Sequence, residues 1–259
     1  MTASAIIADV RSLLAGEPVY LAGSLVAEQT YGKSNCHSDV DLFCPTPQVL
    51  IATGQRLLCN GYTLDDRFGR VWARWLRYGF KQWHTNSLRL HDANGIETNL
   101  VYKLTDGHPT TSLGQVLESF DFGLLATGYD LEADRFMDMR GYLFPGLDPD
   151  GPLPLMPAKR SNWRNGFISQ YNGLREAGRY AKYHGYGYDL TAVKDDLVTG
   201  YWAASSYMST HFDADKQLLG RIYEAIALHI EADNISELTL AAKQIDYKDS
   251  LDVIMEALE

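Results

Sequence analysis

The chain has 259 residues, of which 46% are hydrophobic and 22% are charged, and its formal net charge is -10. This balance supplies enough apolar surface for a core and excludes disordered, collagen-like and coiled-coil chains. No apolar run reaches the roughly 18 residues of a membrane-spanning helix. The three cysteines lack CxxC spacing, which argues against a disulfide framework or a zinc knuckle. We therefore expect a cytoplasmic protein without a membrane segment.

The first third of the chain alternates between strand and helix patterns. A short apolar strand over 19–22 ends at Gly23-Ser24, and a helical pattern follows. After a polar loop around Lys33, acidic and apolar residues alternate over 39–43, as in a half-buried strand. Further along the chain, the sequence predicts a helix at 48–60, an element of ambiguous type at 67–83, and a hairpin whose strands at 88–91 and 96–104 flank an Asn-Gly turn.

The remainder of the chain divides at a stretch rich in proline and glycine. Residues 141–158 contain five prolines and three glycines, which predicts a linker or an ordered arm. Helical patterns then cover 161–184, 192–211, 213–232 and about 235–258. We therefore expect an α/β (α+β) domain over 1–140, the Pro/Gly-rich linker or arm over 141–158, and an all-helical domain over 159–259.

Basic residues gather in two stretches of this acidic chain. Residues 65–91 hold six Lys/Arg against two Asp, and residues 158–188 hold six against one Glu. Such stretches fit either solvated helix faces or a surface that holds one polyanion, such as a triphosphate or an RNA end. In the second stretch, Arg175, Arg179 and Lys182 have i, i+4, i+7 spacing and are predicted to share one helix face.

Three features of the first domain together fit metal-dependent phosphate chemistry. Gly23-Ser24 lies between a strand and a helix, where backbone N–H groups and a hydroxyl suit a phosphate oxygen. Asp39 and Asp41 lie two apart on one strand, so their carboxylates can share one Mg²⁺ ion or bridge two. Glu97, on a later strand, could hold the second ion and help to deprotonate a hydroxyl.

Because these three features follow one another in this order along the chain, the sequence resembles the DNA polymerase beta-like nucleotidyltransferase superfamily over about residues 19–104. The matching segments are Leu21-Ala22-Gly23-Ser24, Ser38-Asp39-Val40-Asp41-Leu42 and Ile96-Glu97-Thr98. Two further segments, Phe120-Asp121-Phe122 and the run from Arg175 to Tyr188, are similar to small stand-alone viral and phage members. The resemblance implies a nucleotidyltransferase-type mixed sheet with flanking helices.

The resemblance also implies an activity: transfer of an NMP from an NTP such as ATP to a hydroxyl, with release of pyrophosphate. It implies two Mg²⁺ ions, for which Mn²⁺ could substitute, held by the catalytic acids Asp39, Asp41 and Glu97. The nucleotide phosphates would contact Gly23 and Ser24. Further contacts to the triphosphate or the acceptor would come from Lys33, Arg175, Arg179 and Lys182. The acceptor stays open among an RNA 3′ end, a protein and a small molecule, and no obligatory protein partner is evident.

Two departures from the family pattern leave alternatives open. The gap between Ser24 and Asp39 is slightly long, which predicts an enlarged loop around Lys33. Asn99-Leu100-Val101 fits the family's acid-apolar-apolar strand pattern about as well as the segment with Glu97 does, so an amide could replace the third acid. The alternative function is therefore a nucleotide- or RNA-binding module of the same fold, without turnover.

Two other features are open between a functional and a structural interpretation. The Trp and Arg residues interleaved over 70–83 fit either base stacking or an amphipathic segment with buried aromatic rings. His37, next to the pair of aspartates, fits either a metal ligand or a loop residue.

Overall fold

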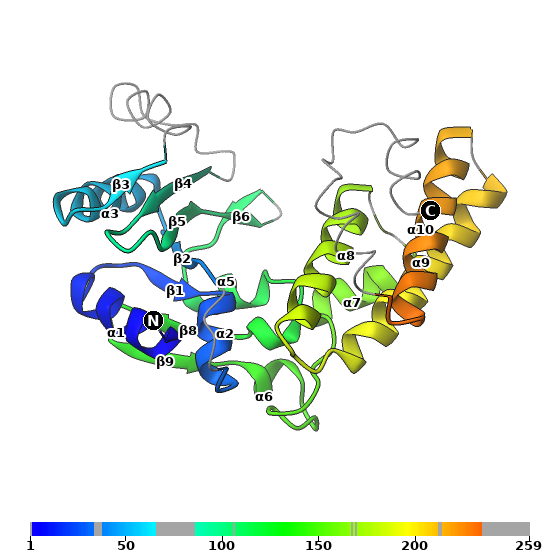
Figure 1. Ribbon diagram of the computed structural model, residues 1–259, viewed down its shortest axis with the longest axis horizontal. Coiled ribbons are helices and arrows are strands. Elements are labelled where there is room, and N and C mark those ends of the chain that lie inside the picture. The colour runs from blue at the N-terminus through cyan, green and yellow to red at the C-terminus, as the bar shows by residue number, and fades with distance from the viewer. Residues whose placement is uncertain are drawn as a thin grey trace. The chain divides into compact units, whose positions relative to one another are not determined.

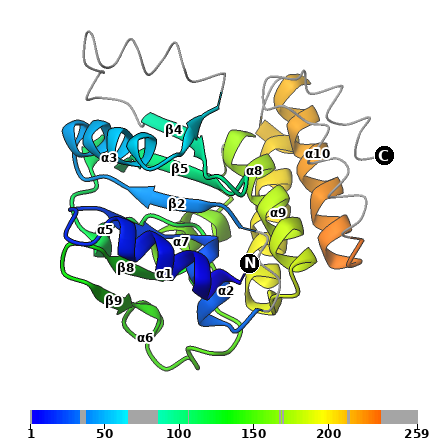
Figure 2. The same ribbon diagram turned by 60° about the vertical axis from the view of Figure 1, so that its left-hand side comes forward.

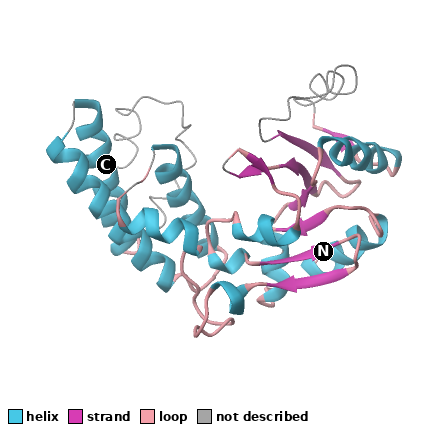
Figure 3. Ribbon diagram, turned by 180° about the vertical axis from the view of Figure 1, so that it is seen from behind, coloured by secondary structure: helices cyan, strands magenta, loops and turns pink. Residues whose placement is uncertain are grey.

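The computed structural model describes residues 2–33, 38–65, 86–105, 107–166, 168, 170–211 and 214–234. The chain forms two compact units, Met1–Phe120 with Leu124–Tyr142, and Asp121–Gly123 with the chain from Leu143 onward (Figure 1). Among the described residues, every strand belongs to the first unit, and the second unit is helical (Figure 3). The protein therefore combines a mixed α/β unit with a helical C-terminal region. No helix in the described ranges is both long and apolar enough to traverse a bilayer.

The first unit contains short helices around a sheet. α1 (Ala3–Leu13), which the sequence analysis does not predict, is capped by Thr2, whose hydroxyl accepts a hydrogen bond from the Ala5 N–H. The predicted helices after Gly23 and over 48–60 are confirmed as α2 (Ser24–Thr30) and α3 (Pro47–Cys59). The other helical elements are α5 (Leu113–Glu118), α6 (Arg140–Leu143) and a 3₁₀ turn over Gly123–Leu125.

Seven strands of the described chain form one mixed sheet in the order β3-β4-β5-β2-β1-β8-β9. They are β1 (Tyr20–Ala22), β2 (Val40–Phe43), β3 (Thr63–Leu64), β4 (Asn86–His91), β5 (Glu97–Tyr102), β8 (Thr127–Asp130) and β9 (Arg135–Asp138). β6 (Leu104–Thr105) and β7 (His108–Pro109) pair separately. In the large sheet β2 and β5 are parallel, and the other neighbours are antiparallel. The predicted strands β1 and β2 and the hairpin β4–β5 are confirmed, whereas the hairpin β8–β9 is not predicted.

Burial alternates along the central strands and separates a core face from a polar face. On β5, Thr98, Leu100 and Tyr102 are buried, whereas the residues between them are half-buried. Leu100 belongs to one buried cluster with Ile7 and Leu50, which come from α1 and α3, the two helices drawn in dark and light blue beside the sheet in Figure 2. Side chains at alternate strand positions point to opposite faces, so the polar residues of these strands lie on the face opposite this core.

The second unit contains four helices in the described range: α7 (Pro157–Arg164), α8 (Gln170–Gly185), α9 (Thr191–His211) and α10 (Ala214–Glu231). α10 and α7 both pack against α9. The predicted helices at 192–211 and 213–232 are confirmed. The prediction of one helix over 161–184 is wrong, because the chain turns at Gly166 with a φ of +70°. A Cβ there would lie 2.9 Å from the Ala203 carbonyl carbon, so glycine permits both the turn and the close approach to α9.

The Pro/Gly-rich segment before α7 packs against the second unit. Its residues Leu153, Leu155 and Met156 are buried. The Met156 N–H donates a hydrogen bond to the Asp121 carbonyl at 2.8 Å, and the Gly123 N–H donates to the Pro154 carbonyl at 2.9 Å. This segment is therefore an ordered arm, although α6 reaches into it at Leu143 and α7 begins at Pro157.

Candidate functional site

Neighbouring strands of the first unit place the predicted site residue Asp41 in one row with Asn99, the alternative third-acid position. Asp41 on β2 is in register with Ala22 on β1 and with Asn99 on β5. Asn99 is in turn in register with Arg89 on β4. Residues paired across a sheet point to the same face, so Asp41, Asn99 and Arg89 share the polar face.

The chain turns sharply between β1 and α2 at Gly23. This residue precedes α2 with a φ of +98° and a ψ of -157°, which is accessible almost only to glycine. A Cβ on Gly23 would lie 2.8 Å from Asp41 Oδ2, so a side chain here would push the Asp41 carboxylate out of its place. α2 begins at the buried Ser24 and spans only seven residues. This turn could therefore bind a phosphate through the first N–H groups of α2 and the Ser24 hydroxyl. Because α2 is so short, its helix dipole contributes little.

Asp39 lies one residue before β2 and next to Glu97. Because the parallel register pairs Val40 with Thr98, the residues before them, Asp39 and Glu97, are also neighbours. Both line a pocket of about 630 Å³, whose other lining residues are Ile6, Ser38, His91, Asn94, Gly95 and Ile96. The hairpin turn between β4 and β5 thus forms part of the pocket wall. The sequence analysis predicts the hairpin but not its place beside the site.

The two candidates for the third acid have different surroundings. Asn99 donates a hydrogen bond from Nδ2 to Asp41 Oδ1 at 3.2 Å. Glu97 Oε1 lies 2.9 Å from Arg89 Nε, but the N–H does not point at it, so this contact is an ion pair without a hydrogen bond. His91 Nε2 lies 3.9 Å from Glu97 Oε2. Asn99 is therefore the residue beside Asp41, whereas Glu97 lies beside Asp39 and Arg89.

These side chains suit a hard divalent cation that arrives together with a phosphate ligand. Within the described residues, no three His, Cys, Asp or Glu side chains gather closely enough to hold a metal ion by themselves. Mg²⁺ usually takes one or two protein carboxylates and completes its shell with water and substrate phosphates. The Asp39 and Asp41 carboxylates fit that requirement, and the amide oxygen of Asn99 is a further hard ligand on the same face.

Glu28 anchors the loop that leads to Asp39. This residue of α2 is 1% exposed, and its carboxylate Oε1 accepts a hydrogen bond from the Ser38 hydroxyl. Its backbone carbonyl accepts a hydrogen bond from the Lys33 N–H at 2.8 Å. Both ends of the predicted loop are therefore tied to one residue. The sequence analysis does not predict a role for Glu28. The available signal is its position, because it is an acid directly after the apolar run Leu25-Val26-Ala27.

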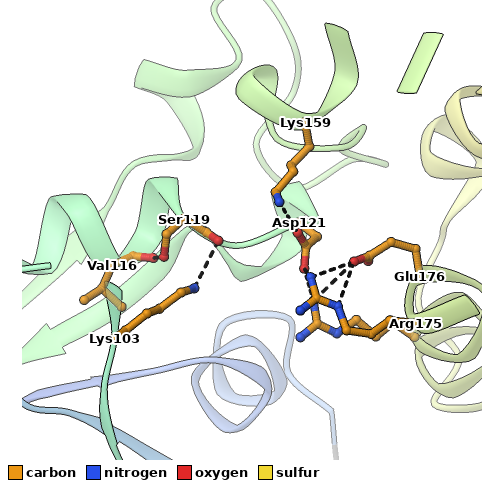
Figure 4. A network of polar contacts seen from close by, with 8 residues as sticks. Lys103, Val116, Ser119, Asp121, Lys159, Arg175 and Glu176 are labelled. Atoms are coloured by element: carbon orange, nitrogen blue, oxygen red, sulfur yellow. Dashed lines mark hydrogen bonds and ion pairs between the residues drawn. The ribbon is translucent and has the colours of Figure 1, made fainter. Parts of the chain in front are cut away.

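The other predicted phosphate contacts belong to α8 of the second unit. Arg175 and Arg179 both contact the buried carboxylate of Asp121, the former at 3.0 Å (Figure 4). Lys182 instead lies over the rings of Tyr183 and Tyr186, with its Nζ 5.8 and 5.7 Å from their centroids. The two arginines thus share a partner, as their spacing predicts for residues on one helix face.

His37 and the Trp/Arg segment at 70–83 lie outside the described residues, as does the predicted helix at 235–258. No protein-family model matches the chain, and no match was found among curated proteins or solved structures.

Proposed function

We propose that the first unit is a Mg²⁺-dependent nucleotidyltransferase of the DNA polymerase beta-like type. The observation that supports it is the meeting of Gly23-Ser24, Asp39 and Asp41 at one end of neighbouring strands, with Asp41 Oδ2 directly against the Gly23 turn. A turn that exposes N–H groups beside a pair of carboxylates provides for both a phosphate and its metal counter-ion.

The proposed reaction moves an NMP from an NTP to a hydroxyl acceptor. Asp39 and Asp41 would hold Mg²⁺, which when bound offsets the negative charge of the triphosphate. The Ser24 hydroxyl and the first N–H groups of α2 donate hydrogen bonds to phosphate oxygens. The acceptor oxygen attacks the α-phosphorus, the bond from this phosphorus to the bridging oxygen breaks, and pyrophosphate leaves. Glu97, on the pocket wall, takes the hydroxyl proton. Lys33 remains a proposed contact of the triphosphate or acceptor, and the cations of α8 remain proposed contacts of a phosphate-bearing ligand on the second unit.

The position of Asn99 favours a second candidate function. An amide lies in register with Asp41, and Glu97 forms an ion pair with Arg89. A site with two carboxylates and an amide could bind Mg²⁺ and nucleotide without catalysing transfer. The second candidate is therefore a nucleotide- or RNA-binding module.

One experiment separates the two candidates. Purified protein is incubated with Mg²⁺ and each α-³²P-labelled NTP, with total RNA, with protein extract, or without added acceptor. We expect label in one acceptor fraction, and its loss in Asp39→Ala/Asp41→Ala. Asp148→Ala/Asp150→Ala is the matched control, because it removes an exposed pair with the same spacing. Nucleotide binding without label in any fraction would assign the site to the binding module.

A further inference from the structure

Three cations of the second unit converge on one buried acid. Lys159 Nζ lies 3.3 Å from Asp121 Oδ1, and Arg175 lies 3.0 Å from Asp121 Oδ2, which Arg179 also contacts (Figure 4). The Asp121 side chain is 5% exposed, whereas the three cationic side chains are 32–36% exposed. The negative charge thus lies inside the unit and the positive charge at its surface.

A second group on α7 has the same layered arrangement. Arg160 Nε and Arg164 Nη2 lie 2.9 and 2.8 Å from Asp196 Oδ1. The Asp196 side chain has no exposed surface, whereas those of Arg160 and Arg164 are 40% and 49% exposed. The Leu155 N–H donates a hydrogen bond to the other oxygen of Asp196 at 3.2 Å. The buried Asp196 carboxylate therefore pairs with both arginines from the interior of the unit.

The two groups carry more cations than their buried acids require. In the contacts of the described residues, five cations lie against three buried carboxylates, because Glu176 is the third, in contact with Arg175 and Arg179. One cation for each acid would offset the cost of burying it. These contacts therefore carry a local excess of two positive charges, in a chain with a net charge of -10. The exposed Lys182, near the end of α8, adds a further positive charge.

We propose that this surface, which comprises Lys159, Arg160, Arg164, Arg175, Arg179 and Lys182, binds the backbone of single-stranded RNA. Four of its six cations are arginines, whose planar guanidinium groups match phosphate oxygens. Their distribution over two helices suits several phosphates in series rather than one. Lys182 lies over the half-exposed ring of Tyr186, and an aromatic ring beside cations is a platform on which an unpaired base can stack. As an assignment of the acceptor class, the inference rests on the proposed function, whereas the RNA binding itself does not.

The test removes the excess charge and leaves each buried acid a partner. Lys159→Gln/Arg164→Gln retains Arg175 and Arg179 for Asp121 and Arg160 for Asp196. The control, Lys216→Gln/Arg221→Gln, removes the same charge from exposed positions of α10. Affinity for a fluorescently labelled mixed-sequence RNA oligonucleotide is measured by anisotropy in EDTA at several salt concentrations. We expect the first variant to bind about tenfold more weakly, and its salt dependence to lose about 0.7 per phosphate contact removed. The control should bind like the wild type.

Each other outcome has a defined meaning. Equal loss in both variants, no RNA binding by the wild type, or equal affinity for poly-glutamate would overturn the inference. Thermal unfolding checks the fold of each variant, and Lys159→Arg/Arg164→Lys, which keeps the charge, should restore most of the affinity. Asp39→Ala/Asp41→Ala should bind RNA normally. RNA binding without label transfer would therefore refute the proposed function alone, and label transfer without RNA binding would refute only this surface.

Discussion

Gly23 has an unusual backbone conformation and lies directly beside Asp41, a residue of the candidate site. Its φ of +98° strongly favours glycine, and a Cβ would lie 2.8 Å from Asp41 Oδ2, so a side chain would also displace that carboxylate. We expect Gly23→Ala to lower the free energy of unfolding by about 3 kcal/mol and to weaken nucleotide binding. Gly16→Ala is the control, because Gly16 has a φ of +77° but no atom within 4 Å of its missing Cβ. It should cost about 1–2 kcal/mol and leave nucleotide binding intact. Urea unfolding measures both, and equal effects would contradict the described approach of Asp41.

Asn99 allows a test of whether a carboxylate beside Asp41 would strengthen cation binding on this face. Asn99→Asp replaces the hydrogen bond to Asp41 with a like-charge pair, so the thermal unfolding temperature should fall in EDTA. Mg²⁺ should raise this temperature more in the variant than in the wild type, with about tenfold tighter Mg²⁺ binding, which is about 1.4 kcal/mol. The control is Gln55→Glu, which makes the same chemical change at an exposed position of α3. A change in unfolding temperature that Mg²⁺ does not affect would show that this face binds no cation.

Cys44 and Cys59 differ in burial and should differ in reactivity. Burial raises the pKa of the Cys44 thiol to about 12, whereas Cys59 is exposed. At about pH 9, iodoacetamide should therefore modify Cys59 in the folded protein and leave Cys44 intact, as peptide mapping can check. Because the folded state keeps the Cys44 proton, its contribution to stability should fall as the pH rises above the unfolded thiol pKa of about 8.5. Labelling of Cys44 in the folded protein at pH 9 would contradict this burial.

The sequence alone could not decide whether Glu97 or Asn99 lies beside Asp41. The alternating pattern predicted the strand of Asp39 and Asp41, and Glu97 and Asn99 lie on one face of β5 because they are two residues apart. That pattern contains no information on the register between two strands separated by more than fifty residues. That register, Asp41 with Asn99, follows from how β2 and β5 pack within the sheet.

At the scale of elements, a single buried acid links α7, α9 and the arm before α7. Asp196 of α9 contacts Arg160 and Arg164 and accepts the Leu155 N–H. Asp196→Asn weakens these charge-assisted hydrogen bonds, but the two arginines left behind are 40% and 49% exposed and stay solvated, so the free energy of unfolding should fall by about 1.5–3 kcal/mol. The neighbouring Asp195 is exposed, and Asp195→Asn should change it by less than about 0.5 kcal/mol. Guanidinium unfolding of both variants checks this difference, and comparable stabilities would show that Asp196 does not hold the unit together.

Helix and strand patterns were most informative where one face is apolar and turn residues flank the element. α3 has Pro47 at its first position and Thr46 as its cap, and both signals are local. The end of α7 is different, because an isolated glycine does not by itself end a helix pattern. Gly166 ends the helix because it turns against Ala203 of α9, a contact that no local pattern contains. The hairpin β8–β9 likewise gains its place by pairing with β1, which is distant in sequence.

For the whole molecule, the net charge does not show which charged side chains are buried and which lie at the surface. The chain is acidic, yet in the second unit Asp121, Glu176 and Asp196 are buried and contact cations that are only partly exposed. Counting charges along the sequence predicted a basic stretch over 158–188 but not which cations share a carboxylate. Burial explains the remainder, because an acid that is removed from water requires partners, and those partners remain partly exposed.

We propose that Asp39 and Asp41 support transfer of a nucleotide rather than of a terminal phosphate. The direct measurement compares NTP labelled with ³²P at the α-position and at the γ-position, using RNA as acceptor. The proposed function predicts that the α-label joins the RNA and the γ-label leaves as pyrophosphate. Both events should disappear in Asp39→Ala/Asp41→Ala and persist in Asp148→Ala/Asp150→Ala. Transfer of the γ-label to the acceptor, or α-label transfer that survives the loss of both aspartates, would contradict it.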